Sequence, residues 1–318
     1  MNEIRVAVIG VGYLGKFHAQ KYSAMDHVEL VGVADIDRTR AAEIAAEFGT
    51  RACSDHRDLL GSVDAVSIVV PTESHYAIGI DFLQHDVDVL IEKPMTSTLA
   101  QADALIELAE ARGRILQIGH LERFNPAVIA LKDIVDRPMF IESHRLSTFK
   151  DRSTDVSVVL DLMIHDIDII MNLVKSEIKD IHAAGAPVIC QQADIANVRL
   201  QFENGCVANV TASRISTKNQ RKIRLFQKDA YIAVDFADRK IVVIRRNPNH
   251  CDGVVPGTDI RQLSFSDADV LEDELAAFIQ AVQTREPPVV SGRAGRKALV
   301  VALKIMDGIE AAIARYLH

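Results

Sequence analysis

The stretch from Val6 to Gly15 constrains the fold more than any other part of the sequence. A short apolar run leads into the pattern Gly-x-Gly-x-x-Gly, at Gly10, Gly12 and Gly15, and a segment with helical character follows. In a strand–turn–helix unit, the first glycine allows a tight turn, the second lets a pyrophosphate approach the backbone, and the third lets the helix pack against its strand. The free N–H groups at the helix start favour negative charge. The stretch therefore predicts a dinucleotide-binding turn.

A carboxylate follows at the position that selects between the two nicotinamide dinucleotides. The second apolar strand, Val28 to Ala34, ends in Asp35, which lies 20 residues past Gly15. A carboxylate there accepts hydrogen bonds from the hydroxyls of an adenosine ribose and repels a 2′-phosphate. NAD is therefore the predicted cofactor. Arg38 and Arg40 could bind the 2′-phosphate of NADP, which therefore stays open as the alternative cofactor. The simpler interpretation is that both arginines lie on the surface of a helix.

Bulk properties exclude several classes of protein. The 318 residues are too many for one small core, so two domains are expected, and the 48% hydrophobic and 25% charged content is that of a globular protein. The net charge of −8 argues against a nucleic-acid partner. No apolar run reaches about 18 residues, and no signal peptide is evident, so we expect a cytoplasmic protein without a membrane partner. The cysteines have no metal-binding spacing, so neither a disulfide framework nor a metal is expected; they are Cys53, Cys190, Cys206 and Cys251.

The order of apolar segments predicts an α/β chain of two domains. Up to about residue 120, short buried strands alternate with helices, which indicates a doubly wound parallel sheet, and we expect a dinucleotide-binding Rossmann domain at 1–121. Beyond it, a long apolar helix at 158–174 is followed by strand-like runs divided by turn signals. A substrate-binding and oligomerisation domain of α+β type, with a large open and mostly antiparallel sheet, is therefore expected at 122–318.

Two places carry residues suited to chemistry. Lys93, in Glu92-Lys93-Pro94, follows a buried strand and so emerges at the carboxyl edge of the sheet, although a lysine there can also simply meet solvent. The long helix presents a polar stripe at spacings of four, three and four residues, formed by Asp161, His165, Asp168 and Asn172. A polar stripe on an otherwise apolar helix suggests the wall of a cleft. The alternative is that Asp161 and His165 are a satisfied pair inside the core.

These residues fit the oxidation of a secondary alcohol. The hydroxyl proton needs a base that titrates near neutrality, which suits His165. The developing alkoxide needs a fixed positive charge, which suits Lys93. Asp161 can orient the imidazole and stabilise its protonated form. We therefore expect Lys93 and His165 to face one cleft and to share one substrate hydroxyl.

This combination resembles the Gfo/Idh/MocA oxidoreductase family over essentially the whole chain. The likeness rests on the Gly10–Gly15 turn, Pro71-Thr72, Glu92-Lys93-Pro94 and Asp161-x-x-x-His165. It implies a Rossmann domain followed by an open-faced sheet, and a catalytic lysine, aspartate and histidine, here Lys93, Asp161 and His165. The residues expected at the cofactor are Gly10, Gly12, Tyr13, Leu14, Gly15, Asp35, Pro71, Thr72, His75, Glu92 and Lys93.

Two stretches, at 119–126 and 158–168, resemble one branch of that family, the UDP-N-acetylglucosamine 3-dehydrogenases. The branch makes a 3-keto sugar that is aminated on the way to lipid A. Basic residues at 214–224 and around Arg145 suit a diphosphate, although a solvated hairpin face explains the first group as well. Arg123 is equally explained by an interdomain salt bridge. The residues expected at the substrate are His120, Arg123, Asn125, Arg145, Asp168, Arg214 and Arg221.

Three functions remain open from the sequence. The first is an NAD-dependent nucleotide-sugar dehydrogenase that oxidises C3 of UDP-N-acetylglucosamine. The second is a dehydrogenase of a free polyol, sugar or diol with the same fold. The third is a dinucleotide-binding regulator without turnover, which has no need of a proton acceptor such as His165. An open sheet leaves apolar area in water, so a homo-oligomer, a dimer or tetramer, is expected.

Overall fold

The fold was analysed in a computed structural model, which describes residues 3–149, 156–249, 255–266 and 268–317. The chain divides into two compact units, one of residues 1–121 and 269–297 and the other of residues 122–268 and 298–318. Lys150 and Arg152, which belong to the basic group around Arg145, lie outside the described residues, as does Cys251. Cys53, Cys190 and Cys206 are free thiols.

The first unit is built on a six-stranded sheet, sheet A, in the order β3-β2-β1-β4-β5-β6. Every pairing in it is parallel. This is the doubly wound order, with its switch point between β1 and β4, where ligands of such sheets bind. The predicted Rossmann sheet is confirmed. Its strands are β1 (Ile4–Ile9), β2 (Val28–Ala34), β3 (Arg51–Cys53), β4 (Ala65–Ile68), β5 (Asp88–Glu92) and β6 (Leu116–Gly119).

Helices cover sheet A, and their ends follow local sequence signals. Asp37 caps α2 by accepting hydrogen bonds from the N–H groups of Thr39 and Arg40, and Thr98 caps α4 by accepting one from Gln101. Gly49 and Gly113 end the same two helices in the left-handed conformation. The helices of this unit are α1 (Tyr13–Ala24), α2 (Arg38–Phe48), the 3₁₀ turn η1 (His56–Leu59), α3 (Thr72–Gln84), α4 (Leu99–Arg112) and α7 (Val270–Thr284).

Helix α7 belongs to the first unit although it lies far along the chain. Leu275 and Phe278 are fully buried in one apolar cluster with Val6, Tyr22 and Val28 of the Rossmann core. The expected second domain at 122–318 is therefore interrupted, because residues 269–297 complete the core of the first unit. The expected boundary after residue 121 coincides with the limit of that unit. Sequence periodicity predicts this helix but does not say which core it covers.

The second unit is built on an eight-stranded sheet, sheet B, in the order β14-β13-β12-β11-β7-β10-β9-β8. All its pairings are antiparallel except that of β7 with β10. The predicted large and mostly antiparallel sheet is confirmed. Its strands are β7 (Phe140–Leu146), β8 (Ile178–Ala186), β9 (Ile195–Phe202), β10 (Val207–Ser213), β11 (Gln220–Gln227), β12 (Ala230–Asp235), β13 (Lys240–Arg246) and β14 (Thr258–Ser264).

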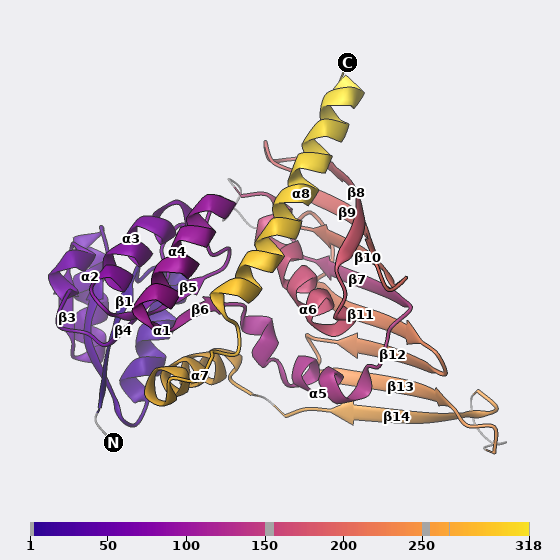
Figure 1. Cartoon of the computed structure of the whole chain (residues 1–318), viewed down its shortest axis with the longest axis horizontal. Coiled ribbons are helices and arrows are strands. Elements are labelled where there is room, and N and C mark those ends of the chain that lie inside the picture. The colour runs from indigo at the N-terminus through magenta and orange to yellow at the C-terminus, as the bar shows by residue number, and fades with distance from the viewer. Residues whose placement is uncertain (1–2, 150–155, 250–254, 267, 318) are drawn as a thin grey trace. The chain divides into compact units, whose positions relative to one another are not determined.

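One face of sheet B carries the helices of the second unit (Figure 1). Apolar side chains of these helices and of the inward-facing strand positions form one continuous buried cluster. The helical segments are the 3₁₀ turn η2 (Leu121–Phe124), α5 (Pro126–Ile134), the π-helical turn η3 (Val159–Met163), α6 (Ile164–Val174) and α8 (Gly292–Leu317), whose residues from 298 onward belong to this unit. Among the described residues, none of the helices has the length and apolar character that crossing a bilayer requires.

Three elements have no clear signal in the sequence. The strand β3 is only three residues long, and β14 is nearly all exposed, so neither shows an apolar pattern. Helix α5 begins directly at Pro126, which is favourable at the first helical position, where no backbone N–H is needed. Its cap, Asn125, stands among the residues that the sequence assigns to the substrate.

Replacing Phe278 by alanine is predicted to destabilise the first unit by about 3–5 kcal/mol, since a fully buried aromatic ring is lost from its core. Chemical denaturation of both proteins measures the difference. Gln283→Ala, at an exposed position of the same helix, is the control and should change stability by less than about 0.5 kcal/mol. Equal effects of the two substitutions would contradict the placement of α7.

Candidate active site

Two of the three glycines in the first turn meet a steric demand, and the third leaves the backbone open. Gly10 has a φ of +84°, and a Cβ there would lie 2.6 Å from the carbonyl oxygen of Val69. A Cβ on Gly15 would lie 1.9 Å from the carbonyl oxygen of Gly10, so only glycine lets α1 approach the strand. A Cβ on Gly12 would meet nothing within 4 Å. The backbone at Gly12 is thus open to a ligand, at the start of a helix whose first turn carries no acidic residue.

Asp35 ties the glycine turn to the end of β2. Its buried carboxylate accepts hydrogen bonds from the backbone N–H of Val11 at 3.0 Å and of Asp37 at 2.9 Å. Arg40 also contacts this carboxylate, at 3.4 Å, and contacts Asp37 at 3.2 Å. The arginine that left NADP open is therefore held by two carboxylates, and the negative charge of Asp35 stays where a 2′-phosphate would be repelled.

A pocket of about 580 Å³ opens beside this carboxylate. Its lining includes Gly10, Gly12 and Asp35, together with Ile36, whose side chain is 96% exposed. Further walls come from Arg40 of α2, from η1, from the segment after β4 and from the start of α3. Mostly apolar walls with a few polar groups are typical of small-molecule sites, and the size suits the adenosine part of a dinucleotide. The residues present therefore fit NAD.

The turn after β4 is joined to the segment that carries Lys93. Pro71 precedes α3, which begins at Thr72. One ring nitrogen of His75 lies 2.8 Å from the carbonyl oxygen of Val70, and the other lies 3.0 Å from that of Pro94. Burial lowers the pKa of His75, although these carbonyl groups oppose the shift. The structure gives His75 the task of linking two loops at the carboxyl edge of sheet A.

Glu92 and Lys93 end β5 at that edge. The peptide bond between Lys93 and Pro94 is cis. The Glu92 carboxylate accepts a hydrogen bond from the backbone N–H of Lys93 at 3.2 Å and lies 3.4 Å from Nε2 of His18.

Tyr13 and Leu14, at the start of α1, are 72% and 36% exposed, whereas His120, which directly follows β6, is buried.

Asp161 and His165 lie on a helix that is not regular. A π-helical turn occupies Val159–Met163, and the α-helix proper begins at Ile164. The expectation of one uninterrupted α-helix is therefore wrong at its start. Because of the π turn, Asp161 and His165 are not related by a regular α-helical turn, so the polar stripe is interrupted between them. Both side chains are half-buried. A π turn inside a helix is frequently found at functional sites, because it redirects side chains there.

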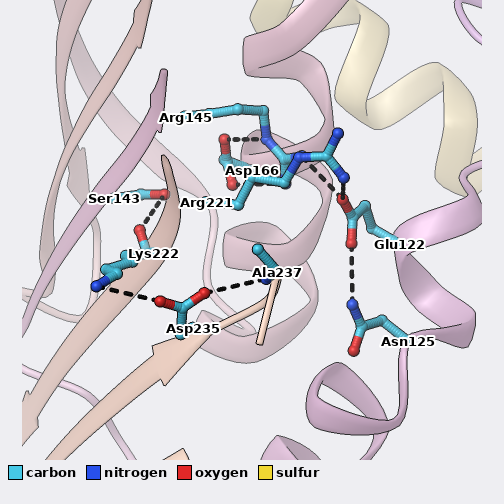
Figure 2. A network of polar contacts seen from close by, with 9 residues as sticks. All are labelled: Glu122, Asn125, Ser143, Arg145, Asp166, Arg221, Lys222, Asp235 and Ala237. Carbon is cyan, nitrogen blue, oxygen red and sulfur yellow. Dashed lines mark hydrogen bonds and ion pairs between the residues drawn. The ribbon is translucent and has the colours of Figure 1, made fainter. Parts of the chain in front are cut away.

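The residue after His165 is anchored by a buried ion-pair network (Figure 2). Arg145 on β7 donates two hydrogen bonds to Asp166, at 2.8 and 3.1 Å, and one to Glu122 at 2.8 Å. Burial alone would lower the pKa of Arg145, but the two carboxylates raise it. In the same way, burial opposes the ionisation of Glu122, yet Arg145 brings its pKa below the usual value. Arg145 and Glu122 therefore favour their charged forms.

A second arginine holds the same helix two residues further on. Arg123 donates two hydrogen bonds to Asp168, at 2.5 and 2.9 Å. Asn125 caps α5 by accepting a hydrogen bond from the N–H of Ala127, and it donates one to Glu122 at 3.3 Å. The residues assigned to the substrate at 123, 125, 145 and 168 therefore make contacts that fix α6 and α5 within their own unit.

The basic residues at 214–224 do not form one surface. Arg214 is buried, donates to the carbonyl oxygen of Val156, and lies 3.9 Å from Asp194. Arg221 pairs with Arg145 in the strand register and is 58% exposed, whereas Lys222 and Arg224 point to the opposite face of sheet B. The predicted diphosphate cluster is therefore split, and among these arginines Arg221 keeps an exposed guanidinium on the helix-covered face.

Sequence reasoning missed the carboxylates that neutralise these arginines. Glu122, Asp166 and Asp194 were not assigned a role, although Asp166 already breaks the apolar face of its helix. A buried acid next to a candidate base is a signal that could have been used, because it requires a partner. Within the described residues, no three His, Cys, Asp or Glu side chains are grouped to hold a metal ion.

Arg145→Met is predicted to destabilise the second unit by about 3–5 kcal/mol at neutral pH, because the buried carboxylates of Asp166 and Glu122 lose the guanidinium that neutralises them. The lowered pKa of Glu122 contributes stability that is present above about pH 4.3 and is lost as the pH falls. The stability gap between wild type and variant should therefore shrink in acid, as denaturation at several pH values measures. Arg224→Met, which breaks the exposed pair with Glu142, is the control, and we expect it to cost no more than about 1 kcal/mol. A gap as small as that of the control would contradict the network.

Comparison with known proteins agrees with this arrangement over both units. Residues 4–120 match the family described as "Oxidoreductase family, NAD-binding Rossmann fold", and residues 134–233 match the Gfo/Idh/MocA C-terminal domain. The UDP-N-acetylglucosamine 3-dehydrogenase of Acidithiobacillus ferrooxidans is 40% identical over 316 residues, which cover 99% of this chain and 100% of that protein. Its crystal structure superimposes with a TM-score of 0.91 over 98% of this chain and 99% of that one.

More distant relatives act on inositols. The myo-inositol 2-dehydrogenase of Thermotoga maritima is 26% identical, over 96% of each chain. A scyllo-inositol dehydrogenase from Lactobacillus casei, solved with NAD(H), has a TM-score of 0.83 at 18% identity over 98% of each chain, and so shares the fold. The matches to both domains, in the order found here, show that this chain belongs to the Gfo/Idh/MocA family of NAD-binding oxidoreductases.

Proposed function

We propose that this protein oxidises the C3 hydroxyl of UDP-N-acetylglucosamine with NAD and produces the 3-keto nucleotide sugar. The observation that carries the proposal is similarity over the whole chain. A relative with that activity in its name is 40% identical over 99% of the chain, whereas the myo-inositol dehydrogenase is 26% identical over 96%. We further propose that the reaction takes place in the cytoplasm and supplies a keto sugar for amination, as lipid A synthesis requires.

The catalytic roles in this proposal fall to three side chains. The residues around Gly12 and Asp35 would hold NAD, which would supply the acceptor for the hydride that leaves the carbon carrying the hydroxyl. His165 takes the hydroxyl proton, because an imidazole titrates near neutral pH. Lys93 stabilises the developing alkoxide with its positive charge. Asp161 orients His165 and favours its protonated form.

The cofactor-binding roles rest on the first unit. The open backbone at Gly12 and the N–H groups at the start of α1 receive the pyrophosphate, and Tyr13 and Leu14 flank it. Asp35 receives the adenosine ribose beside the 580 Å³ pocket. In the second unit we assign the diphosphate of the substrate to Arg221, since its side chain is 58% exposed and pairs weakly, at 3.8 Å, with Glu122.

A free polyol is the second candidate substrate, because inositol dehydrogenases are among the relatives. A polyol has no phosphate, so it gains nothing from an exposed guanidinium. The role of Arg221 therefore separates the two candidates.

We also propose that sheet B mediates a homodimer or tetramer. The face opposite its helices carries an apolar stripe across five strands, in register order Phe140, Phe226, Tyr231, Ile244 and Ile260. Phe226 is 37% exposed and Ile260 is 48% exposed. A contiguous apolar surface of this kind favours burial against a second copy.

Steady-state kinetics tests the function and its residues. Wild-type protein is predicted to reduce NAD in the presence of UDP-N-acetylglucosamine. His165→Ala and Lys93→Met should lower kcat by about 10²–10⁴-fold with smaller effects on substrate affinity, because both groups act in the transition state. Arg221→Ala should mainly raise KM. Oxidation of myo-inositol but of no UDP-sugar would replace the first candidate by the second.

Cofactor choice is tested by titration. Wild-type protein is predicted to bind NAD more tightly than NADP, and Asp35→Ser should narrow that difference, because the charge that repels a 2′-phosphate is removed. Arg38→Ser, at an exposed position of α2, is the control and should leave the ratio unchanged. Tighter binding of NADP by the unaltered protein would overturn the assignment of Asp35.

Light scattering at micromolar concentration tests the assembly. We expect wild type to be a dimer or tetramer and Phe226→Lys to dissociate, because a charge is placed in the apolar stripe. Glu203→Lys, in an exposed turn, should leave the mass unchanged. A wild-type monomer would contradict the proposal.

A further inference from the structure

Three titratable side chains from three different elements are buried together in the first unit. His18 of α1 and Glu274 of α7 have no exposed surface, and Glu92 at the end of β5 is 8% exposed. His18 Nε2 lies 3.4 Å from Glu92 Oε1, a contact that is longer than a good hydrogen bond. Gly119 of β6 closes the cluster, since a Cβ there would lie 2.9 Å from the Glu92 carboxyl group.

The two carboxyl groups have opposite tendencies to ionise. Burial opposes the charge of Glu92, yet His18 and Lys93 bring its pKa below the usual value. Burial raises the pKa of Glu274 well above the usual value, and the negative charge of Glu92 raises it further. Glu92 is thus the ionised acid and Glu274 the neutral one. The other titratable groups that sense these charges are Tyr22 of α1 and His75 of α3.

Burial of the Glu274 carboxyl group destabilises the folded state. Neither of its carboxyl oxygens has a hydrogen-bond partner among the described residues, and the same holds for both ring nitrogens of His18 and for Oε1 of Gln117. A buried polar group without a partner destabilises the folded state, whereas an apolar side chain in its place would add to the surrounding core. Leu275 and Phe278 of the same helix show that α7 packs well with apolar residues. Packing alone does not explain the acid.

We propose that Glu274 stores a proton for a buried His18–Glu92–Glu274 cluster and thereby keeps a single negative charge directly behind Lys93. This inference rests on the role proposed above for Lys93. Glu274 is a positioning residue, because it acts on Lys93 through Glu92, whose carboxylate accepts the Lys93 backbone N–H at 3.2 Å. Loss of the stored proton places a second negative charge beside Glu92. The electrostatic potential at Lys93 then changes, and the two negative charges of Glu92 and Glu274 repel each other inside the core.

The stability of the protein without substrate provides the first test. Because the pKa of Glu274 is raised in the folded state, wild type should lose stability as the pH rises from about 4.3 toward that raised pKa. Glu274→Gln has the same shape and cannot ionise, so its stability relative to wild type should increase with pH. Asp273→Asn, at the exposed neighbouring position, is the matched control and should follow wild type. Parallel curves for wild type and Glu274→Gln would overturn the stored proton.

The pH profile of kcat provides the second test, since a merely structural role would not move it. Wild type should lose activity on the alkaline side, and in Glu274→Gln that loss should move to higher pH or disappear. Asp273→Asn should keep the wild-type profile. Rates are measured with whichever of UDP-N-acetylglucosamine and myo-inositol is oxidised. An unchanged profile in Glu274→Gln would overturn the positioning role even if stability responds. If neither alcohol is oxidised, the proposed function and the positioning role both fail, while the denaturation curves still decide whether Glu274 holds a proton.

Discussion

Burying two aspartates on an otherwise apolar helix constrains the second unit more than any other interaction. Asp166 and Asp168 follow His165 on α6, and each is almost completely removed from water. A buried carboxylate persists only with a partner, and Arg145 and Arg123 supply one each through paired hydrogen bonds. These pairs connect the helix to β7 and to the segment before α5. They therefore set the position and rotation of the helix that presents His165.

The first unit also buries acidic side chains, but it does not neutralise all of them with arginines. Burial raises the pKa of Glu274, and the negative charge of Glu92 raises it further, so this second acid stays neutral rather than paired. In both units, buried acidic side chains lie next to the residues to which we assign catalysis, Lys93 and His165. Polar groups that weaken a core are typical of functional sites, where stability is exchanged for a defined charge.

The sequence predicts the Rossmann unit well, because its signals are local. Gly10 and Gly15 each meet a steric demand, Gly12 leaves the backbone open, and the alternation of strands and helices indicates a parallel sheet. The sequence is weaker where partners are distant. The core that α7 covers, the π turn before Ile164 and the carboxylates that neutralise Arg145 and Arg214 depend on contacts between residues far apart in the chain. Basic residues that are close in sequence suggest one diphosphate-binding surface. However, successive side chains of a β-strand point to opposite faces, so Arg221 and Lys222 lie on different faces of sheet B.

Isotope transfer tests the central claim most directly. UDP-N-acetylglucosamine carrying deuterium at C3 is incubated with the protein and NAD, and the reduced cofactor and the sugar are analysed by mass spectrometry. The account predicts that the deuterium is recovered on the nicotinamide ring of the reduced cofactor and that the sugar becomes a 3-ketone. Reduced cofactor without deuterium, or a ketone at another carbon, would contradict it.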